Sequence, residues 1–315
     1  MFSTNKIFFI SDMHLDELYD NESDTNYVKN RSKRQRFLDE IKKHKKDTII
    51  VNGDFYNDYH RSIEIIREID KMGIKGFWTF GNHEWHDCAA MTLEFQLTRE
   101  SRKIARVLNS NKIDIKQFPV VSYYSTLAYK KPDVSKFENI KNAMIQCGKE
   151  CKNFKLLTVG STYKLGKYTL IGDVGWSSFT NNDGKVSNEK DYFDNWTEQW
   201  DFEWMKKQNA NWLKFANSVV AKNKNVIIAT HYPMYLPDSK NVSEKGKRFE
   251  KDYNSHGEKF ILYWFSKNPI KISKDQNVIF IHGHSHTPSL KDGHHSNPIG
   301  RKKDSFPMRL KELVL

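Results

Sequence analysis

The feature that most constrains the fold is a series of short apolar runs, each ending in a polar or glycine-containing turn. Runs of this kind predict buried strands, at residues 6–10, 48–51, 76–80, 168–172, 225–229 and 277–281. Segments with the apolar spacing of a helix lie between several of them, at residues 34–45, 62–72, 93–108, 196–220 and 257–266. We expect the fourth helix to break near Gln208. The alternation of strands and helices predicts an α/β fold.

The remaining segments predict irregular structure. Residues 113–131 and 177–191 favour irregular or β-hairpin structure, and residues 237–251 and 291–307, which are rich in Asn, Ser, Gly and Lys, favour loops. The sequence contains no internal repeat and no evident domain boundary. Because 315 residues with 38% hydrophobic content can bury a large core, we expect a single domain over residues 1–315.

The chain is basic. It has 51 Lys and Arg against 39 Asp and Glu, a formal charge of +12. Such a charge attracts nucleotides, nucleic acids and other phosphorylated partners. Its Lys-rich stretches are more often solvated faces, and this applies also to Lys33, Arg34 and Arg36, which begin a predicted helix. Charge therefore keeps nucleic acid among the partners without identifying a site for it.

Cysteine usage and hydropathy indicate a reducing compartment. Cys88, Cys147 and Cys151 form no even disulfide framework, and the last two have the i, i+4 spacing of packed helix residues. The first apolar run is too short for the core of a signal peptide, and no run reaches the length of a membrane span. We expect a soluble, cytoplasmic protein that does not bind membranes.

Polar side chains capable of binding metal follow the predicted strands. Asp12 and His14 come directly after the first one, and in an extended segment this spacing turns both side chains to the same side. Alone, such a pair is more often a surface turn. Further candidate ligands follow the other strands: Asp54, Asn82, His231, His284 and His286. The carboxyl ends of strands are where open α/β folds place their sites, so these side chains can converge.

These blocks resemble an ordered family signature. Asp12-x-His14, Gly53-Asp54, Gly81-Asn82-His83-Glu84, His231 and Gly283-His284-Ser285-His286 occur in that order over nearly the whole chain. The sequence is thereby similar to the calcineurin-like metallophosphoesterases, whose signature is D-x-H, G-D-x-x-D, G-N-H-[DE], H and G-H-x-H. The resemblance implies a four-layer α/β/β/α sandwich of two mixed sheets flanked by helices.

The resemblance also implies a dinuclear metal centre. One metal would be bound by Asp12, His14, Asp54 and His286, and the other by Asp54, Asn82, His231 and His284, so that Asp54 bridges the pair. Mixed imidazole and oxygen ligands suit Mn, with Fe, Zn or Ni as alternatives, better than an all-oxygen magnesium site. The implied reaction is hydrolysis of a phosphoester by a hydroxide that bridges two divalent metal ions.

By the same resemblance His83 is the general acid that protonates the leaving oxygen, a role that suits imidazole because it titrates near neutral pH. The alternative is a purely structural His. The family's usual orienting Asp is replaced here by Asn57, with Asp58 beside it, so either residue could orient His83. The Arg that usually precedes G-N-H-E in protein phosphatases is replaced by Phe80, which makes a phosphoprotein substrate less probable.

The expected substrate is a phosphorylated small molecule or nucleotide, hydrolysed as a phosphodiester or phosphomonoester. Two alternatives stay open: a nuclease acting on DNA or RNA, and a non-catalytic scaffold with the same fold. Nothing in the sequence specifies an oligomeric state. Two other sets of residues stand out. A stripe formed by Trp196, Trp200 and Trp204 favours core packing over base stacking. His86, His294 and His295 could add metal or phosphate contacts.

Overall fold

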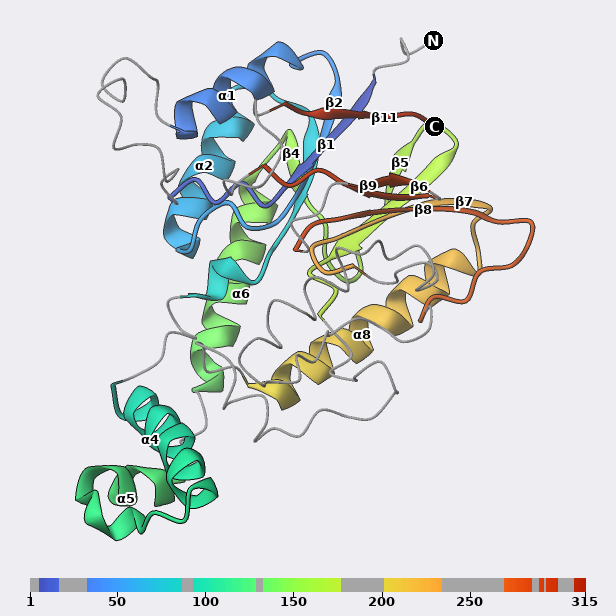
Figure 1. Cartoon of the computed structure of the whole chain (residues 1–315). Helices are drawn as coiled ribbons and strands as arrows, with labels where there is room; N and C mark the ends of the chain where they lie inside the picture. Colours follow the sequence, from blue (N-terminus) through green and yellow to red (C-terminus); the bar gives the residue numbers. More distant parts are fainter. Residues whose placement is uncertain are drawn as a thin grey trace.

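The computed structural model describes residues 6–16, 33–86, 93–128, 133–176, 201–233, 269–284, 289–291, 293–299 and 309–315. Two sheets dominate it (Figure 1). The first has five strands in the order β11 (Lys311–Leu313), β1 (Ile7–Ser11), β2 (Thr48–Asn52), β3 (Gly76–Thr79) and β4 (Phe154–Leu156). The second has six, in the order β5 (Tyr163–Leu165), β6 (Tyr168–Asp173), β7 (Asn225–Thr230), β8 (Asn277–His282), β10 (His294–Ser296) and β9 (Ser289–Lys291).

Both sheets are mixed. Strands β1 to β4 are parallel to their neighbours, and β11 adds an antiparallel edge beside β1. In the second sheet β6, β7, β8 and β10 are parallel, whereas β5 and β9 form antiparallel edges. Because the central strands of each sheet run the same way, their carboxyl ends gather at one edge of that sheet.

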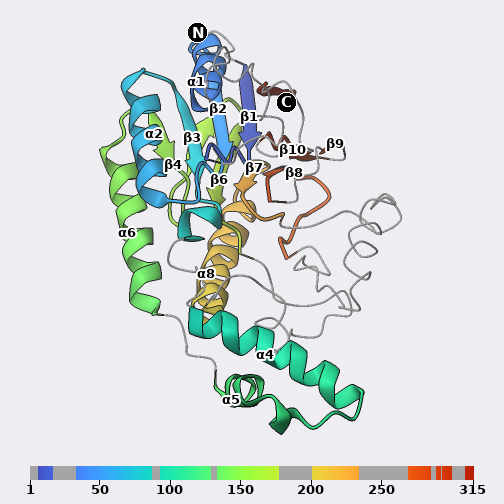
Figure 2. The same ribbon diagram turned by 60° about the vertical axis from the view of Figure 1, so that its left-hand side comes forward.

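Helices cover the outer faces of both sheets. Helices α1 (Lys33–Lys43), α2 (Tyr59–Lys71) and α6 (Val134–Glu150) lie against the first sheet, and α8 (Phe202–Val220) lies against the second (Figures 1 and 2). The order of layers is therefore helix, sheet, sheet, helix. The predicted α/β/β/α sandwich is confirmed.

Strand alternation explains why both sheets are buried on both faces. Along β1, Phe8 and Ile10 belong to the apolar cluster shared with α1, whereas Ile7 and Phe9 belong to the cluster between the two sheets. Successive side chains of a strand point to opposite faces, so a continuous apolar run fills two layers at once. Each fully buried large apolar side chain contributes about 1.5–3 kcal/mol to folding.

The second sheet follows the same rule. Val226 and Ile228 of β7 face α8, where they pack with Trp212 and Ala216, while the intervening Ile227 packs in the layer between the sheets. Helix α8 continues through Gln208, so the expected break is wrong. Gln is a good helix former, so its polar side chain does not interrupt the helix. Its amide oxygen accepts a hydrogen bond from Lys141 Nζ at 2.6 Å.

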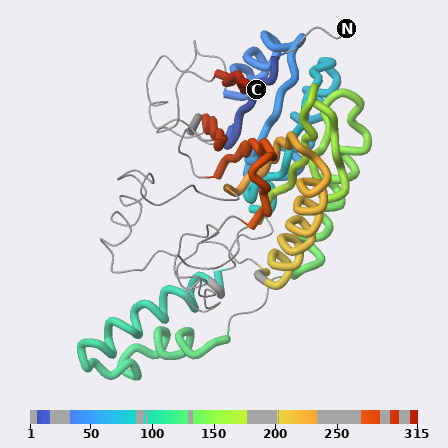
Figure 3. The backbone as a smooth tube through the Cα atoms, turned by 90° about the vertical axis from the view of Figure 1, so that its right-hand side faces the viewer, coloured from blue at the N-terminus to red at the C-terminus, as the bar shows by residue number. Residues whose placement is uncertain are grey.

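Residues 113–131 were expected to be irregular or a β-hairpin, and the structure corrects this. They contain the 3₁₀ helix η3 (Ile115–Gln117) and helix α5 (Pro119–Thr126). Asp114 caps η3 by accepting a hydrogen bond from the Lys116 amide at 2.9 Å. Pro119 stands at the start of α5, where a proline needs no amide proton and its fixed φ suits the helix. Helix α4 (Leu93–Ser110) packs against α5, and Figures 1 and 3 show the pair lying away from the two sheets.

Two further expectations need correction. Helix α6 has no counterpart among the predicted helices, although Asp133 caps it and Phe137, Ile140, Met144 and Cys147 are buried at helical spacing. Residues 291–307 were expected to be a loop but contain β10, which pairs with β8. Cys147 and Cys151 are buried free thiols, as expected from their helical spacing.

Some predictions lie outside the described residues: those for residues 177–191, 237–251 and 257–266, for Trp196 and Trp200, and for Cys88. Trp204 is described, and it is buried against Trp85 and Phe137, with ring centroids 6.0 and 5.4 Å away. It therefore packs in the core. Among the described residues, no helix combines the length and the apolar character needed to cross a bilayer.

Candidate metal centre

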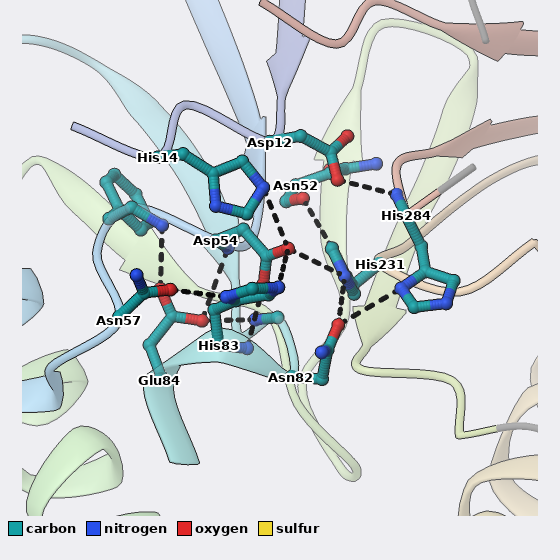
Figure 4. Close-up of polar contacts among 12 residues, drawn as sticks. Asp12, His14, Asn52, Asp54, Asn57, Asn82, His83, Glu84, His231 and His284 are labelled. Atoms are coloured by element: carbon teal, nitrogen blue, oxygen red, sulfur yellow. Dashed lines mark hydrogen bonds and ion pairs between the residues drawn. The ribbon is translucent and has the colours of Figure 1, made fainter. Parts of the chain in front are cut away.

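The candidate ligands emerge where the central strands end (Figure 4). Asp12 and His14 follow β1, Asp54 follows β2, and Asn82 follows β3. From the second sheet come His231, directly after β7, and His284, shortly after β8. The structure therefore brings six of the seven predicted ligands together. His286 lies outside the described residues.

The backbone at these positions is unusual. Asp12, His14, Asp54 and His284 have φ values of 52°, 41°, 56° and 62°. This left-handed region disfavours any residue with a Cβ atom, and each such residue costs of order 1–3 kcal/mol unless its surroundings compensate. Non-glycine residues with this conformation gather at functional sites, and Lys112 is the only other one in the described part of the chain.

Glycines allow the turns to touch one another. A Cβ at Gly81 would lie 2.0 Å from Asp54 Oδ1, and one at Gly283 would lie 2.6 Å from Asp12 Oδ2. Gly53 has a φ of +70°, and a Cβ there would lie 2.5 Å from Gly81 Cα. No larger residue fits at these three positions without moving a candidate ligand or its turn. The glycines of the sequence blocks thus allow the turns that carry the candidate ligands to lie against one another.

The Asp54 carboxylate lies at the centre of the cluster. Its Oδ2 atom is 3.3 Å from His231 Nε2, 3.5 Å from His14 Nε2 and 3.9 Å from His83 Nε2. Two groups of possible donors, one made of His14, Asp54 and His83 and the other of Asp12, Asp54 and His231, each lie within 4.8 Å, and Asp54 belongs to both. This is the arrangement expected of a carboxylate shared by two cations.

The hydrogen-bond pattern around His231 fits a cation. Its Nδ1 donates to the Asn52 carbonyl oxygen at 3.1 Å. A neutral imidazole carries one N–H proton, so Nε2 presents a lone pair. That lone pair faces oxygens at 2.9 Å on Asn82 and 3.3 Å on Asp54. Ligand atoms that each lie about 2.1 Å from a metal are roughly 3 Å from one another, which matches these separations.

His284 is the last of the candidate ligands among the described residues. Its Nδ1 lies 3.0 Å from Oδ1 of Asn82, and its backbone amide donates to Asp12 Oδ1 at 2.7 Å. Asn82 Oδ1 is therefore flanked by two imidazole nitrogens, those of His231 and His284. These contacts join the carboxyl ends of strands from both sheets, so the site exists only when the sheets pack together.

His83 lies at the margin of the cluster with its ring half-buried. Its Nδ1 donates a short hydrogen bond to Asn57 Oδ1, and the Asn57 amide in turn donates to Asp16 Oδ2 at 2.9 Å. Asp58 serves instead as the N-cap of α2, where its carboxylate accepts from the His60 amide at 2.8 Å. Of the two residues that could orient His83, the structure therefore selects Asn57.

Two charged residues near the site have roles that the sequence did not indicate. Lys33 was expected to be solvated, yet it is buried and its Nζ donates to the His14 carbonyl oxygen at 2.5 Å. Glu84 is fully buried, and burial raises the pKa of its carboxyl group to about 7. Glu84 is a charged residue within the Gly81-Asn82-His83-Glu84 block, and that position is the sequence signal that could have indicated a structural role for it beside the site.

Three other histidines near the strand ends are buried or pack against an aromatic ring. His294 is buried and stacks on Phe280, with ring centroids 4.7 Å apart. His86 stacks on His83 at 5.7 Å. Burial lowers the pKa of His282 to about 4, which keeps this ring neutral behind Asp12 and Gly283. In the described part of the chain, no donor group that could hold a metal includes His86, His294 or His295.

A solved structure of phosphopantetheinyl hydrolase (PptH) from Mycobacterium tuberculosis is 12% identical over 100% of this chain and 97% of that chain, with a TM-score of 0.47. A second solved structure is 11% identical over 98% of each chain, with a TM-score of 0.39. No curated protein matches the sequence. The family model described as calcineurin-like phosphoesterase matches residues 5–288. The chain therefore belongs to the calcineurin-like phosphoesterase family.

Proposed function

We propose that the protein is a dinuclear metal-dependent phosphoesterase that hydrolyses a phosphodiester or a nucleotide-type phosphoester. The observation that carries this proposal is the position of Asp54 Oδ2, within 3.9 Å of imidazole nitrogens on His14, His83 and His231. A carboxylate surrounded by imidazoles from two sheets is suited to share two cations. Burying a carboxylate costs free energy, and a bound cation offsets that cost.

The proposed ligands follow from the family resemblance and the donor positions. One metal takes Asp12, His14 and Asp54 together with His286, and the other takes Asp54, Asn82, His231 and His284. Mn is the preferred ion, and Fe, Zn or Ni also suit mixed nitrogen and oxygen donors. When bound, such metals polarise phosphoryl oxygens and lower the pKa of a coordinated water.

The chain's own residues supply the proton and the orientation. The bond from phosphorus to the leaving oxygen breaks as a bond to a hydroxide oxygen forms, and His83 Nε2 gives its proton to the leaving oxygen. The proton that water loses in forming the hydroxide passes to solvent. Because Nδ1 of His83 is held by Asn57, the ring presents Nε2 towards Asp54 and the reaction site. The general acid of this account is therefore His83, and Asn57 keeps it in position.

Charge and sequence both favour a small phosphorylated substrate. Two carboxylates do not neutralise two divalent ions, so the cluster stays positive and attracts a phosphate. Phe80, which replaces the arginine usual in protein phosphatases, is buried and offers no contact to a phosphoprotein. The formal charge of +12 gives specific support to a second candidate, hydrolysis of DNA or RNA.

The test uses metal-stripped protein and three substrates: bis-p-nitrophenyl phosphate, p-nitrophenyl phosphate and a single-stranded oligonucleotide. Mn, Fe, Ni, Zn and Mg are restored separately. We expect Mn-restored turnover of the diester. Faster cleavage of the oligonucleotide that falls steeply with added salt would favour the nuclease. Absence of turnover with every metal and every substrate would contradict the phosphoesterase and favour the scaffold.

A further inference from the structure

Glu84 makes an unusual set of hydrogen bonds beside the metal cluster. Its Oε2 accepts from the backbone amides of Gly81 at 2.6 Å and Asp54 at 3.2 Å. Its Oε1 accepts from the Phe55 amide at 2.7 Å and from the Ser62 hydroxyl at 3.3 Å. The side chain is fully buried, and these four donors are uncharged. A buried carboxylate that accepts several amide bonds holds the donating backbone firmly in place.

These hydrogen bonds join two separate turns. Asp54 and Phe55 belong to the turn after β2, whereas Gly81 belongs to the turn after β3. A reciprocal bond runs the other way, because the His83 amide donates to Asp54 Oδ1 at 3.0 Å. Figure 4 shows Glu84 on the side of Asp54 opposite to His231 and Asp12, so it reaches the turns from behind the cluster.

The turns that Glu84 joins carry ligands on both sides of the cluster. Asp54 is the shared carboxylate, and it has a φ of 56°, a conformation that needs support from its surroundings. Asn82 lies between Gly81 and His83, so the amide on each side of it is hydrogen-bonded to a carboxylate. No larger residue fits at Gly81, so the two turns are in direct contact at this point.

We propose that Glu84 is the positioning residue that sets the distance between Asp54 and Asn82, and thereby the pairing of the two metals. This inference rests on the proposed dinuclear centre. Glu84 touches neither substrate nor metal and acts through the backbone of the residues that do. It is thus a support of the metal pair, distinct from the acid His83.

Three variants test the proposal. Glu84→Gln keeps the shape but turns one oxygen into an amide donor, which then faces a backbone N–H. Glu84→Asp keeps both oxygens and shortens the side chain, as the alternative residue of the signature does. Ser62→Ala is the matched control, because it removes only the hydroxyl contact to Oε1. Each variant is compared with the wild type for Mn affinity and stoichiometry by equilibrium dialysis. Thermal unfolding of the metal-free protein reports whether each variant folds.

The decisive readout is the electron paramagnetic resonance spectrum of the Mn-loaded protein, because two Mn ions bridged by a carboxylate are exchange-coupled. We expect a coupled pair in the wild type and in Ser62→Ala. Glu84→Gln is expected to bind its second Mn roughly 10–100-fold more weakly and to give an uncoupled spectrum, as is usual when an outer partner of a ligand is lost. Glu84→Asp should recover part of the coupling.

The outcomes separate this inference from the proposed function. A wild type that never forms a coupled Mn pair overturns both. A wild type with a coupled pair, together with a Glu84→Gln variant of unchanged Mn affinity and coupling, overturns the positioning role alone. If Glu84→Gln does not fold, Glu84→Asp decides: a partial loss of Mn affinity and coupling in that folded variant supports the proposal, and full wild-type affinity and coupling would contradict it, because a carboxylate shortened by one methylene group cannot keep all four hydrogen bonds of Glu84.

Discussion

Gly81→Ala is the substitution whose effect follows most directly from the geometry of the site. The new Cβ would lie 2.0 Å from Asp54 Oδ1 and 2.4 Å from the Asp54 amide nitrogen. Ordinary contacts begin at 3.4 Å, so the carboxylate oxygen must move by about 1.4 Å, the difference between 3.4 and 2.0. Gly81 itself does not have a positive φ, so backbone strain at position 81 does not contribute.

The magnitude follows from that displacement. A shift of about 1 Å in a group that positions the reaction costs roughly 100-fold in rate, and overpacking a buried site costs about 1–3 kcal/mol of stability. We therefore expect Gly81→Ala to lower Mn-restored turnover of a phosphodiester by at least roughly 100-fold while the protein still folds. Turnover at saturating Mn and thermal unfolding, measured on the same preparation, report the two effects separately.

The matched control is Gly76→Ala, at the other end of β3. A Cβ there would lie 2.4 Å from the Ile49 carbonyl oxygen, a clash of similar severity that lies far from the ligands. This control should lose stability but keep its turnover per folded molecule. Wild-type turnover in Gly81→Ala would refute the reasoning, because it would mean that the position of Asp54 does not matter to the reaction.

Three further predictions concern the acid, the shared carboxylate and pH. His83→Ala should keep its metals and lose about 10²–10⁴-fold in turnover of an ester with a poor leaving group, and a nitrophenolate ester should be much less affected; equal losses on both esters would argue against a general acid. Asp54→Asn should bind fewer than two Mn per chain by dialysis, whereas Asp58→Asn, which preserves the cap of α2, should bind as the wild type does. In the metal-free protein, burial lowers the pKa of His282 from 6.5 to about 4, so its contribution to stability is lost as pH falls through that window. Burial raises the pKa of Glu84 from 4.5 to about 7, so its charged form costs stability as pH rises through that window. Each effect is about 3 kcal/mol and the two oppose each other, so His282→Gln should leave a free energy of unfolding that decreases from pH 4.5 to pH 7. A flat profile for this variant would contradict the raised pKa of Glu84, and a profile identical to that of the wild type would contradict the lowered pKa of His282.

The sequence was sufficient to predict the central strands and the convergence of the candidate ligands at their carboxyl ends. Apolar runs such as that of β1 are buried on both faces, and the polar residue that ends each run marks the edge of the sheet. Glycines at fixed places in the blocks indicated close turns, and the structure shows clashing Cβ positions at Gly81 and Gly283. Local pattern was sufficient here because each ligand stands within a few residues of the strand that places it.

The parts that the sequence did not reveal depend on distant partners. Glu84 and Lys33 carry charges that usually indicate solvent, and only the fold shows that backbone groups of other segments surround them. Helix α5 contains Val120 and Tyr123, residue types that favour strands, but both side chains are exposed, and the helix begins at Pro119 and lies beside α4. The sequence could not decide whether Asn57 or Asp58 is the partner of His83, because the answer depends on where the folded chain places the two side chains.

The measurement that tests the central claim most directly is a titration of metal-stripped protein with Mn, in which bound Mn and phosphodiester turnover are followed in the same samples. The shared position of Asp54 predicts that turnover appears as the second equivalent binds and reaches its maximum at two Mn per chain. Maximal turnover with one equivalent bound, or turnover that persists in the metal-stripped protein, would contradict a dinuclear centre built on Asp54.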